Sequence, residues 1–413
     1  MSANISSLTR LKVPFFRTAI SETEIDEVVS CLRSGWLTTG PRVRQFEESF
    51  ALAVRARHAI AVNSCTAALH LAVEALGLRP GQGVLVPTLT FAATAEVVRY
   101  QGAIPILVDC DPATLNMDLD DAESKLERLR GGWLNFPSDL PVVGIMPVHV
   151  GGMMMDMHAV RELARRYELW VVEDAAHAFP AAQRSDGEQE WRFCGENTSD
   201  VTCFSFYTNK TITTGEGGMA TTADQALADR MRQMSLHGLS SDAWGRYSGR
   251  GGWDYRIVAP GYKYNLTDIA ASLGNHQLAR AEEMRRDRQA IARQYSEAFR
   301  SVPELELPLD PVDRLHAWHL YPIRLRLNQL AINRNQFMEQ LREEGVGSSV
   351  HWRPLHLHPY YQETFGWTPE NLPVATEEWE RLVSLPLFPS MTDEERDYVV
   401  RTVIELCQRH TVR

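Results

Sequence analysis

Lysine is the scarcest charged residue in this sequence of 413 residues. Only four of the 42 basic residues are lysines, and arginine supplies all the others. A reaction that needs an amine nucleophile must therefore draw on a small set of candidates, namely Lys12, Lys125, Lys210 and Lys263.

Paired cysteines and long apolar runs are missing as well. The six cysteines are scattered, with no CxxC pair and no spacing typical of metal ligands. This pattern indicates reduced thiols rather than disulfides or a metal site. The N-terminus lacks the apolar stretch of a signal peptide, and no run approaches the ~20 apolar residues of a membrane helix. We therefore expect a cytoplasmic protein with no metal site and no membrane partner.

A surplus of positive charge is also absent, because the formal net charge is -11. Nucleic acids and anionic membranes are poor partners for such a chain, since nothing would neutralise their phosphates over a broad surface. A local basic pocket for one small anionic ligand remains compatible with this charge.

Short β-branched runs alternate with helical patterns from about residue 58 onward. Near-continuous apolar strands separated by helices are typical of an α/β fold with a mostly parallel sheet covered on both faces. The expected strands are 58–62, 84–87, 104–111, 142–148, 169–174 and 201–206, and the helices between them are 64–76, 92–100, 118–129 and 155–167. Ligands bind beyond the carboxyl ends of such strands, so polar residues there are the first candidates for a site.

The chain is long enough for a large domain, expected over residues 1–270, and a smaller C-terminal α+β domain over 271–413. One long helix over 267–300 is expected to link them. The segment 235–264 is rich in Gly, Trp and Tyr and too irregular for a helix. A loop of this length inside a compact domain is more often functional than idle.

Two expected strand ends carry a lysine and an aspartate. Lys210 ends the run FSFYTNK, among apolar or small neighbours. Burial would make its amine usable near neutral pH, whereas an exposed loop lysine is the alternative. Asp174 ends the run LWVVED, where it either faces a cleft or caps the next helix.

The turn after the first strand is suited to phosphate. Ser64, Cys65 and Thr66 stand where a helix begins, and unpaired N–H groups with a positive dipole end favour an anion there. Plain N-capping explains this stretch equally well, and Ser205 offers a further hydroxyl. The run GEGGM (215–219) lacks the spacing of a dinucleotide fingerprint and predicts a tight turn with close backbone approach.

Two rings complete the candidates. Phe91, in PTLTFAAT, is placed to stack on a cofactor ring, with a core position as the alternative. His177, in EDAAHA, can lie beside such a ring or serve structure alone. An amine, an acid, an aromatic face and phosphate donors together are what pyridoxal phosphate (PLP) requires.

These segments resemble the DegT/DnrJ/StrS family of sugar aminotransferases, PLP enzymes with the aspartate aminotransferase fold (fold type I). The resemblance runs from SGWLTTGP (34–41) to SLPLFPSMT (384–392). In between, PTLTFAAT, EDAAHA, FSFYTNKTITTGEGGM and PGYKYNLTDIAA stand in family order and spacing. The family has a PLP-binding large domain and a smaller C-terminal domain.

The resemblance implies a role for each candidate. Lys210 would bond the aldehyde of PLP and later shuttle the proton, with pyridoxamine phosphate as the second cofactor form. Asp174 would pair with the pyridine nitrogen, Phe91 would stack on the ring, and His177 would lie near the cofactor. The residues implied to hold the phosphate are Cys65, Thr66 and Ser205.

The family is also a homodimer with shared active sites, in which a GYNYR-type segment reaches the neighbouring phosphate. Here that segment reads Gly-Tyr-Lys-Tyr-Asn (261–265), with lysine where asparagine is commonest. Either Lys263 or Asn265 would make the contact.

The segments GYKYNLTD, HAWHL (316–320) and SLPLFP are most similar in sequence to one branch of the family, the ArnB type. This branch aminates UDP-4-keto-pentose for lipid A modification. The lysine segment follows the general family form instead. We therefore expect an amino group to move from an amino acid, L-glutamate, to a 4-keto sugar linked to a nucleotide, UDP. The candidates for binding this substrate are Thr38, Thr39, Arg246 and His351.

Three alternatives stay open. A 3-keto sugar aminotransferase is barely distinguished by these motifs. A PLP-dependent sugar dehydratase is disfavoured because those relatives have histidine in place of Lys210. A non-catalytic regulator on this fold is disfavoured by the joint presence of Lys210, Asp174 and the phosphate turn.

Overall fold

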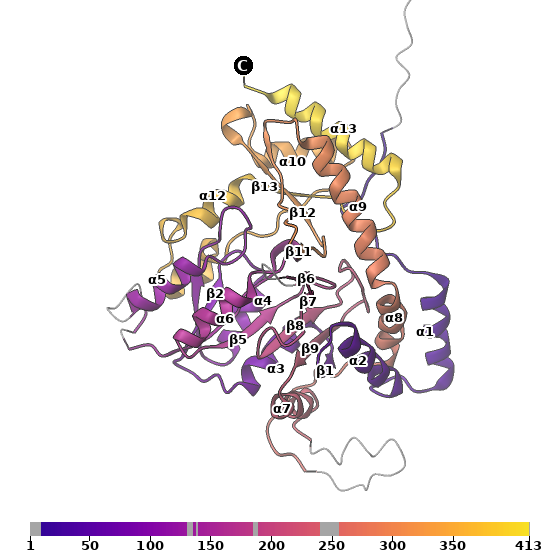
Figure 1. Ribbon diagram of the computed structural model, residues 1–413, viewed down its shortest axis with the longest axis vertical. Coiled ribbons are helices and arrows are strands. Elements are labelled where there is room, and N and C mark those ends of the chain that lie inside the picture. The colour runs from indigo at the N-terminus through magenta and orange to yellow at the C-terminus, as the bar shows by residue number, and fades with distance from the viewer. Residues whose placement is uncertain (1–9, 130–134, 138, 185–188, 240–255, 413) are drawn as a thin grey trace, which may run out of the picture.

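A seven-stranded sheet forms the centre of the large domain in the computed structural model, which describes residues 10–129, 135–137, 139–184, 189–239 and 256–412 (Figure 1). Its strand order is β1-β9-β8-β5-β4-β2-β3. Its strands are β1 (His58–Val62), β2 (Gly83–Pro87), β3 (Ile104–Val108), β4 (Val142–Ile145), β5 (Trp170–Asp174), β8 (Val201–Ser205) and β9 (Gly218–Thr222). Neighbours pair in parallel except β9, which is antiparallel to β1 and β8. The expected α/β architecture with a mostly parallel sheet is confirmed.

Helices cover this sheet, and every residue of β2 is buried because both of its faces are packed. Helix α3 packs against α4 and α7, whereas α2 packs against β1 and α8. The large-domain helices are α1 (Glu22–Ser34), α2 (Pro41–Ala53), α3 (Cys65–Ala75), α4 (Ala93–Tyr100), α5 (Leu119–Leu129), α6 (Met157–Arg166), α7 (Gln225–Ser235) and the 3-10 helix η1 (Val150–Gly152). The expected helices agree with these bounds to within a few residues.

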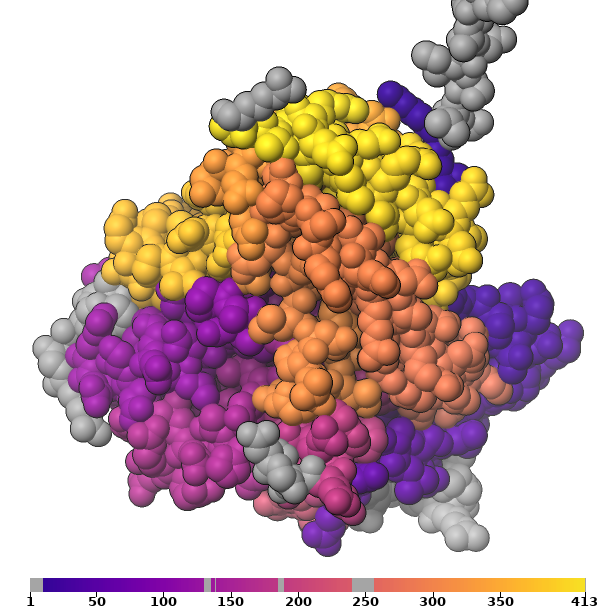
Figure 2. All heavy atoms as spheres, turned by 45° about the horizontal axis from the view of Figure 1, so that its top comes forward, coloured from indigo at the N-terminus to yellow at the C-terminus, as the bar shows by residue number. Residues whose placement is uncertain are grey.

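The C-terminal part has a core of its own, which includes Tyr295, Trp318, Phe337 and Phe388. A three-stranded antiparallel sheet, of order β10-β12-β13, packs there with helices that come before it and after it in the chain. Its elements are α9 (Ala281–Phe299), β10 (Leu305–Glu306), β12 (Tyr321–Leu325), α10 (Arg334–Glu343), β13 (Leu382–Leu385) and α13 (Asp393–His410). Figure 2 shows these orange and yellow residues covering one side of the purple and magenta large domain.

A small third sheet, of order β11-β6-β7, ties the two parts together. Strand β11 precedes β12 in the chain and pairs with β6 of the large domain. The remaining elements are β6 (Ala182–Gln183), β7 (Arg192–Phe193), β11 (Arg314–Leu315), η3 (Leu327–Gln329), η4 (Leu355–Leu357), α11 (Pro359–Phe365), η5 (Pro369–Asn371) and α12 (Pro373–Arg381).

The single long helix expected over 267–300 is wrong. Two helices, α8 (Asp268–Ala279) and α9, meet at Arg280, whose φ of -104° and ψ of 1° are not helical. The Arg280 guanidinium binds the buried carboxylate of Glu24 at 3.1 Å. Helix propensity does not reveal this break, and Arg280 makes there a tertiary contact that local sequence patterns cannot show. The boundary expected at residues 270/271 falls inside α8 and stays a prediction.

Among the described helices, none has both the length and the apolar character needed to cross a membrane. What matters for function is the edge at which β5 and β8 end. There Asp174 and Ser205 lie at the carboxyl ends of neighbouring parallel strands. The N-terminus of α3 faces the same cavity.

Candidate active site

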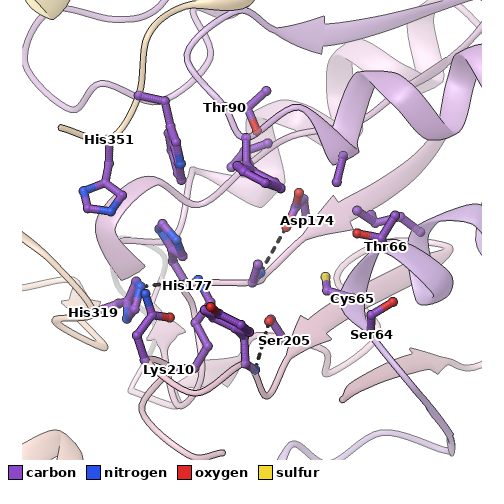
Figure 3. A pocket seen from close by; sticks show the side chains of 18 of the residues that line it. Ser64, Cys65, Thr66, Thr90, Asp174, His177, Ser205, Lys210, His319 and His351 are labelled. Atoms are coloured by element: carbon purple, nitrogen blue, oxygen red, sulfur yellow. Dashed lines mark hydrogen bonds between the residues drawn. The ribbon is translucent and has the colours of Figure 1, made fainter. Parts of the chain in front are cut away.

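A cavity of about 480 Å³ lies at this edge of the sheet (Figure 3). Segments far apart in the sequence line it, because each strand end delivers its next residues to the same place. The expected site residues that line the cavity are Ser64, Cys65, Thr66, Phe91, Asp174, His177, Ser205, Lys210 and His351.

Lys210 brings an amine into the cavity, five residues beyond the end of β8. Its backbone N–H donates to the Tyr207 carbonyl at 2.9 Å, in a turn that aims the side chain inward. Burial lowers the pKa of Lys210 to about 8, although the nearby Cys65 and Asp174 act to raise it. About a tenth of this amine is therefore neutral and nucleophilic at pH 7, far more than for an ordinary lysine.

Asp174 supplies a buried carboxylate across the cavity from the lysine. The Thr94 hydroxyl donates to its Oδ2 at 2.7 Å, and the Ala176 N–H donates to its Oδ1 at 3.1 Å. Burial raises the pKa of Asp174 even though these two donors act to lower it. Neither donor carries a charge, so a cationic N–H group in the cavity would stabilise the carboxylate strongly.

The turn at Ser64 forms the anion-binding end of the cavity. The Ser64 side chain caps α3 by accepting from the Ala67 N–H at 3.1 Å. Cys65 and Thr66 open the helix, so their first-turn N–H groups and hydroxyl face the cavity with the positive dipole end. Gly218 packs so closely here that an added Cβ would lie 2.4 Å from the Ser64 carbonyl carbon. The GEGGM run thus lets β9 approach this turn.

Rings close the remaining sides. Phe91 lines the cavity with 62% of its surface exposed, so one face of the ring is open to a ligand. His177 stacks on Trp352, with centroids 4.9 Å apart and planes 22° apart. His351 enters from the C-terminal part, where its Nδ1 lies 3.0 Å from the Ser384 hydroxyl. Burial lowers the pKa of His177 well below its usual value and that of His351 to about 4, so both rings are neutral.

Sequence reasoning missed Thr94 and His319, which both belong to this site, and gave Trp352 no role near the cofactor. The His319 Nε2 lies 3.4 Å from the Lys210 Nζ, and its ring centroid lies 4.2 Å from that of His177. The HAWHL motif was the available signal for His319. The Nδ1 atoms of His177 and His319 and the Asn209 Oδ1 are buried without a hydrogen-bond partner among the described residues. Polar groups of a ligand would satisfy such atoms.

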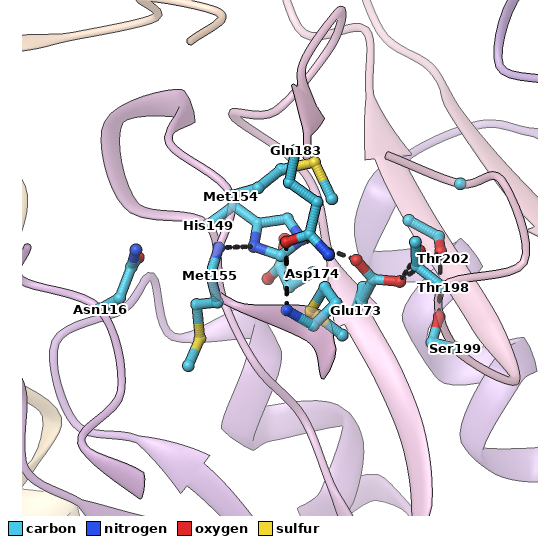
Figure 4. Close-up of polar contacts among 12 residues, drawn as sticks. Asn116, His149, Met154, Met155, Glu173, Asp174, Gln183, Thr198, Ser199 and Thr202 are labelled. Carbon is cyan, nitrogen blue, oxygen red and sulfur yellow. Dashed lines mark hydrogen bonds and ion pairs between the residues drawn. The ribbon is translucent and has the colours of Figure 1, made fainter. Parts of the chain in front are cut away.

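A second layer of polar contacts lies behind β5 (Figure 4). The His149 Nδ1 accepts from the Met155 N–H at 3.2 Å, so its Nε2 carries the proton and donates to Glu173 at 2.8 Å. Burial acts to raise the pKa of Glu173, but the hydrogen bonds from His149 and Thr198 outweigh it and lower the pKa. The backbone N–H of His149 also donates to the backbone carbonyl of Asp174 at 3.2 Å, which holds the end of β5.

These buried groups also lie close to Cys194, and together the three have the residue types of a metal site. The direct bond between His149 and Glu173 already engages one ligand atom of each. A structural role that holds Asp174 in place therefore explains the group.

The other expected residues lie outside this cavity. The Lys263 ammonium donates to the Asn265 Oδ1, and the Asn265 amide donates to the Thr39 hydroxyl at 2.7 Å. Thr39 and Asn265 line a second cavity, whereas Thr38 contributes its carbonyl to the Asp268 N–H at 3.1 Å. Arg246 lies outside the described residues, as do all of residues 240–255 in the expected loop 235–264.

The amine, the buried acid whose hydrogen-bond donors are uncharged, the open ring face and the helix N-terminus fit PLP in one cavity. With the mixed sheet and the smaller C-terminal part, they define the class of fold type I PLP enzymes.

Comparison with known proteins narrows this class. Residues 18–404 match the DegT/DnrJ/EryC1/StrS aminotransferase family, and the chain belongs to that family. The spore coat polysaccharide biosynthesis protein SpsC of Bacillus subtilis is 43% identical over 395 residues, 95% of this chain and 97% of its own.

Solved structures of similar proteins support the same family assignment. The putative sugar aminotransferase Spr1654 of Streptococcus pneumoniae, in its PLP form, superposes with a TM-score of 0.85 at 30% identity, covering 97% of this chain and 99% of its own. A pyridoxamine phosphate (PMP) form of the same protein is equally similar. PseC of Helicobacter pylori shares the fold with a TM-score of 0.85 at 21% identity, covering 97% and 100%. The chain is therefore a PLP-dependent sugar aminotransferase, which uses a sugar substrate and an amino donor.

The lowered pKa of Lys210 predicts how cofactor capture depends on pH. Only the neutral amine attacks an aldehyde, so the rate at which cofactor-free protein bonds PLP should rise as the pH rises through about 8. Below that value the rate should fall about tenfold per pH unit. Stopped-flow absorbance measures it, with a simple alkyl amine as the control for the titration of PLP itself. A rate that follows the ordinary lysine pKa would contradict the effect of burial.

Proposed function

We propose that this chain transfers the amino group of L-glutamate to the C4 keto group of a sugar linked to a nucleotide, UDP. The observation that carries the proposal is the meeting of Lys210, Asp174 and the α3 N-terminus in one cavity. The choice of a 4-keto, UDP-linked acceptor is supported by the ArnB-type sequences of the segments around Lys263 and His319. A place in polysaccharide biosynthesis is supported by the name of the relative SpsC.

In this proposal each side chain has a defined task. When bound, PLP supplies an electron sink for the charge that develops as the donor loses its α-proton. The Lys210 Nζ takes that proton from the donor's α-carbon, because its pKa of about 8 suits both uptake and release. The Asp174 carboxylate, held by Thr94 and Ala176, would pair with the pyridine nitrogen and keep its proton in place.

The remaining residues bind and orient. Phe91 would cover one face of the cofactor ring, and His177, which stacks on Trp352, would lie near the cofactor. The phosphate would be bound by Ser64, Cys65, Thr66 and Ser205. His351 faces the cavity from the C-terminal part and is proposed to contact the sugar substrate. Thr38, Thr39 and Arg246 remain proposed substrate contacts.

We further propose a homodimer with shared sites, in which Lys263 or Asn265 of one copy reaches the phosphate of the other. Neither residue lines the cavity of its own chain, which supports a role toward a second copy. A cytoplasmic location is supported by the cysteines, since Cys31, Cys65, Cys110, Cys194, Cys203 and Cys407 are all free.

Replacing the lysine tests the core of the proposal. Lys210→Ala removes both the bond to PLP and the proton carrier, so turnover should fall by about a thousandfold or more. The long-wavelength absorbance band of the purified protein should also disappear. Lys12→Ala is the matched control, because Lys12 does not line the cavity. Survival of the band in the Lys210 variant would refute the assignment.

The acceptor is tested with substrates. Incubation with UDP- and dTDP-linked 4-keto sugars and L-glutamate, followed by NMR of the product, should place the new nitrogen on C4 of the UDP sugar. Nitrogen on C3, or loss of a hydroxyl without amination, would instead support the 3-keto aminotransferase or the dehydratase.

Mixing inactive variants tests the shared site. At limiting PLP, Lys210→Ala and the double variant Lys263→Ala/Asn265→Ala should each be nearly inactive alone. A mixed dimer contains one site with both lesions and one intact site, so an equal mixture should recover about a quarter of wild-type activity. A mixture as inactive as its parents would count against sites shared in this way.

A further inference from the structure

A histidine of the C-terminal part lies against the lysine of the large domain. The His319 Nε2 is 3.4 Å from the Lys210 Nζ, and Figure 3 shows the two side chains next to each other at the floor of the cavity. His319 stands between β11 and β12, more than a hundred residues after Lys210 in the chain. The contact therefore joins the two cores of the molecule.

The backbone that carries His319 is held firmly from the side of α9. The buried Arg288 guanidinium donates through its Nη1 to the carbonyls of Leu387 at 2.8 Å, His319 at 3.3 Å and Trp318 at 3.4 Å. Trp318 is buried at a positive φ of 49° and receives a stacking contact from His316, with centroids 4.0 Å apart. A tryptophan adopts such a conformation only where its surroundings impose it.

The large domain holds the same segment from the other side. The Ala317 N–H donates to the Gly152 carbonyl at 3.0 Å, and the Leu320 N–H donates to the Gly151 carbonyl at 3.1 Å. Gly152 has a φ of +103°, and an added Cβ would lie 3.2 Å from the His319 nitrogen and 2.8 Å from the His177 carbonyl oxygen. The backbone that carries the His319 ring is thus held by both parts of the chain.

The surroundings of His319 decide which atom donates the hydrogen. Lys210, His177, Arg288 and His351 face it, and burial together with these groups lowers the pKa of His319 well below its usual value. The imidazole is therefore neutral. An ammonium group has only donors, so the Lys210 Nζ donates and the His319 Nε2 accepts. The ring proton then lies on Nδ1, the atom that has no partner among the described residues.

We propose that His319 is a positioning residue for Lys210. By accepting one N–H hydrogen, its Nε2 orients the lysine nitrogen so that the other substituent positions on that nitrogen, occupied by hydrogen or by the lone pair, point toward the cavity. Once the amine is neutral, one hydrogen is engaged by His319, so the lone pair and the second hydrogen lie on the cavity side and the lone pair can reach the cofactor aldehyde or the proton on the donor's α-carbon. This inference rests on the proposed role of Lys210. If His319 has this role, Lys210 is fully reactive only when the C-terminal part is packed in place against the large domain.

The scarcity of lysine makes a direct test possible. Cofactor-free protein labelled with ¹³C at lysine Cε contains only four lysines, and Lys210→Arg identifies the Lys210 signal. His319→Phe keeps an aromatic ring but removes the acceptor that favours the ammonium form. The Lys210 pKa should therefore fall by about one unit from its value of about 8.

The second readout is the rate at which cofactor-free protein bonds PLP at high pH, where the amine is neutral in all variants. This plateau should fall about tenfold in His319→Phe, because the lone pair is no longer oriented. His319→Gln can place an amide oxygen near the Nε2 position and should restore both readouts. His319→Asn is the matched control, since its shorter amide should not reach Lys210.

An unchanged Lys210 pKa and plateau rate in His319→Phe would overturn the proposal. If the Phe variant does not fold, the comparison of Gln with Asn decides, and equal values in these two variants would overturn it as well. Bonding of PLP by Lys210→Arg would overturn the role of Lys210 and this proposal together. Loss of bonding in Lys210→Arg with no effect at His319 would overturn the positioning role alone.

Discussion

Desolvation of two opposite charges in one cavity is the constraint on which the active site depends. Asp174 and Lys210 both lose hydration at the carboxyl ends of β5 and β8, and burial moves their pKa values toward the neutral forms. Neither group bonds the other directly: Thr94 holds the carboxylate and His319 contacts the amine. The two groups therefore stay separated and available, and the cofactor class of the protein follows from that separation.

The rest of the large domain serves to keep these two groups in place. The pair of Glu173 and His149 satisfies the buried polar atoms next to Asp174 and anchors the end of β5. On the other side, the close packing of Gly218 on Ser64 sets the distance between β9 and the first turn of α3. Rigid strands thus deliver the acid and the phosphate turn, while the lysine sits in a turn that the C-terminal part completes.

Much of this arrangement could be predicted from the sequence, because parallel sheets convert linear order into position. Each strand end was visible as an apolar run followed by a polar residue, so Asp174, Ser205 and the turn at Ser64 were within reach of pattern reasoning. The contact of His319 with Lys210 and the stacking of Trp352 on His177 were not, because they depend on how a second core docks. The break at Arg280 escaped for the same reason: its partner, Glu24, lies more than two hundred residues away in the chain.

Gly152 shows what such docking means for genetic variation in this enzyme. It has no side chain, donates no group to the cavity and belongs to a short 3-10 turn, yet a Cβ added there would lie close to the backbones of both His177 and His319. A larger residue there would push against the His177 carbonyl and crowd the His319 backbone, so it would disturb two cavity-lining histidines. In a mutational screen, this position would therefore give the phenotype of an active-site lesion without being a residue that handles a ligand. The glycine at this position thus serves the active site as much as it serves the fold.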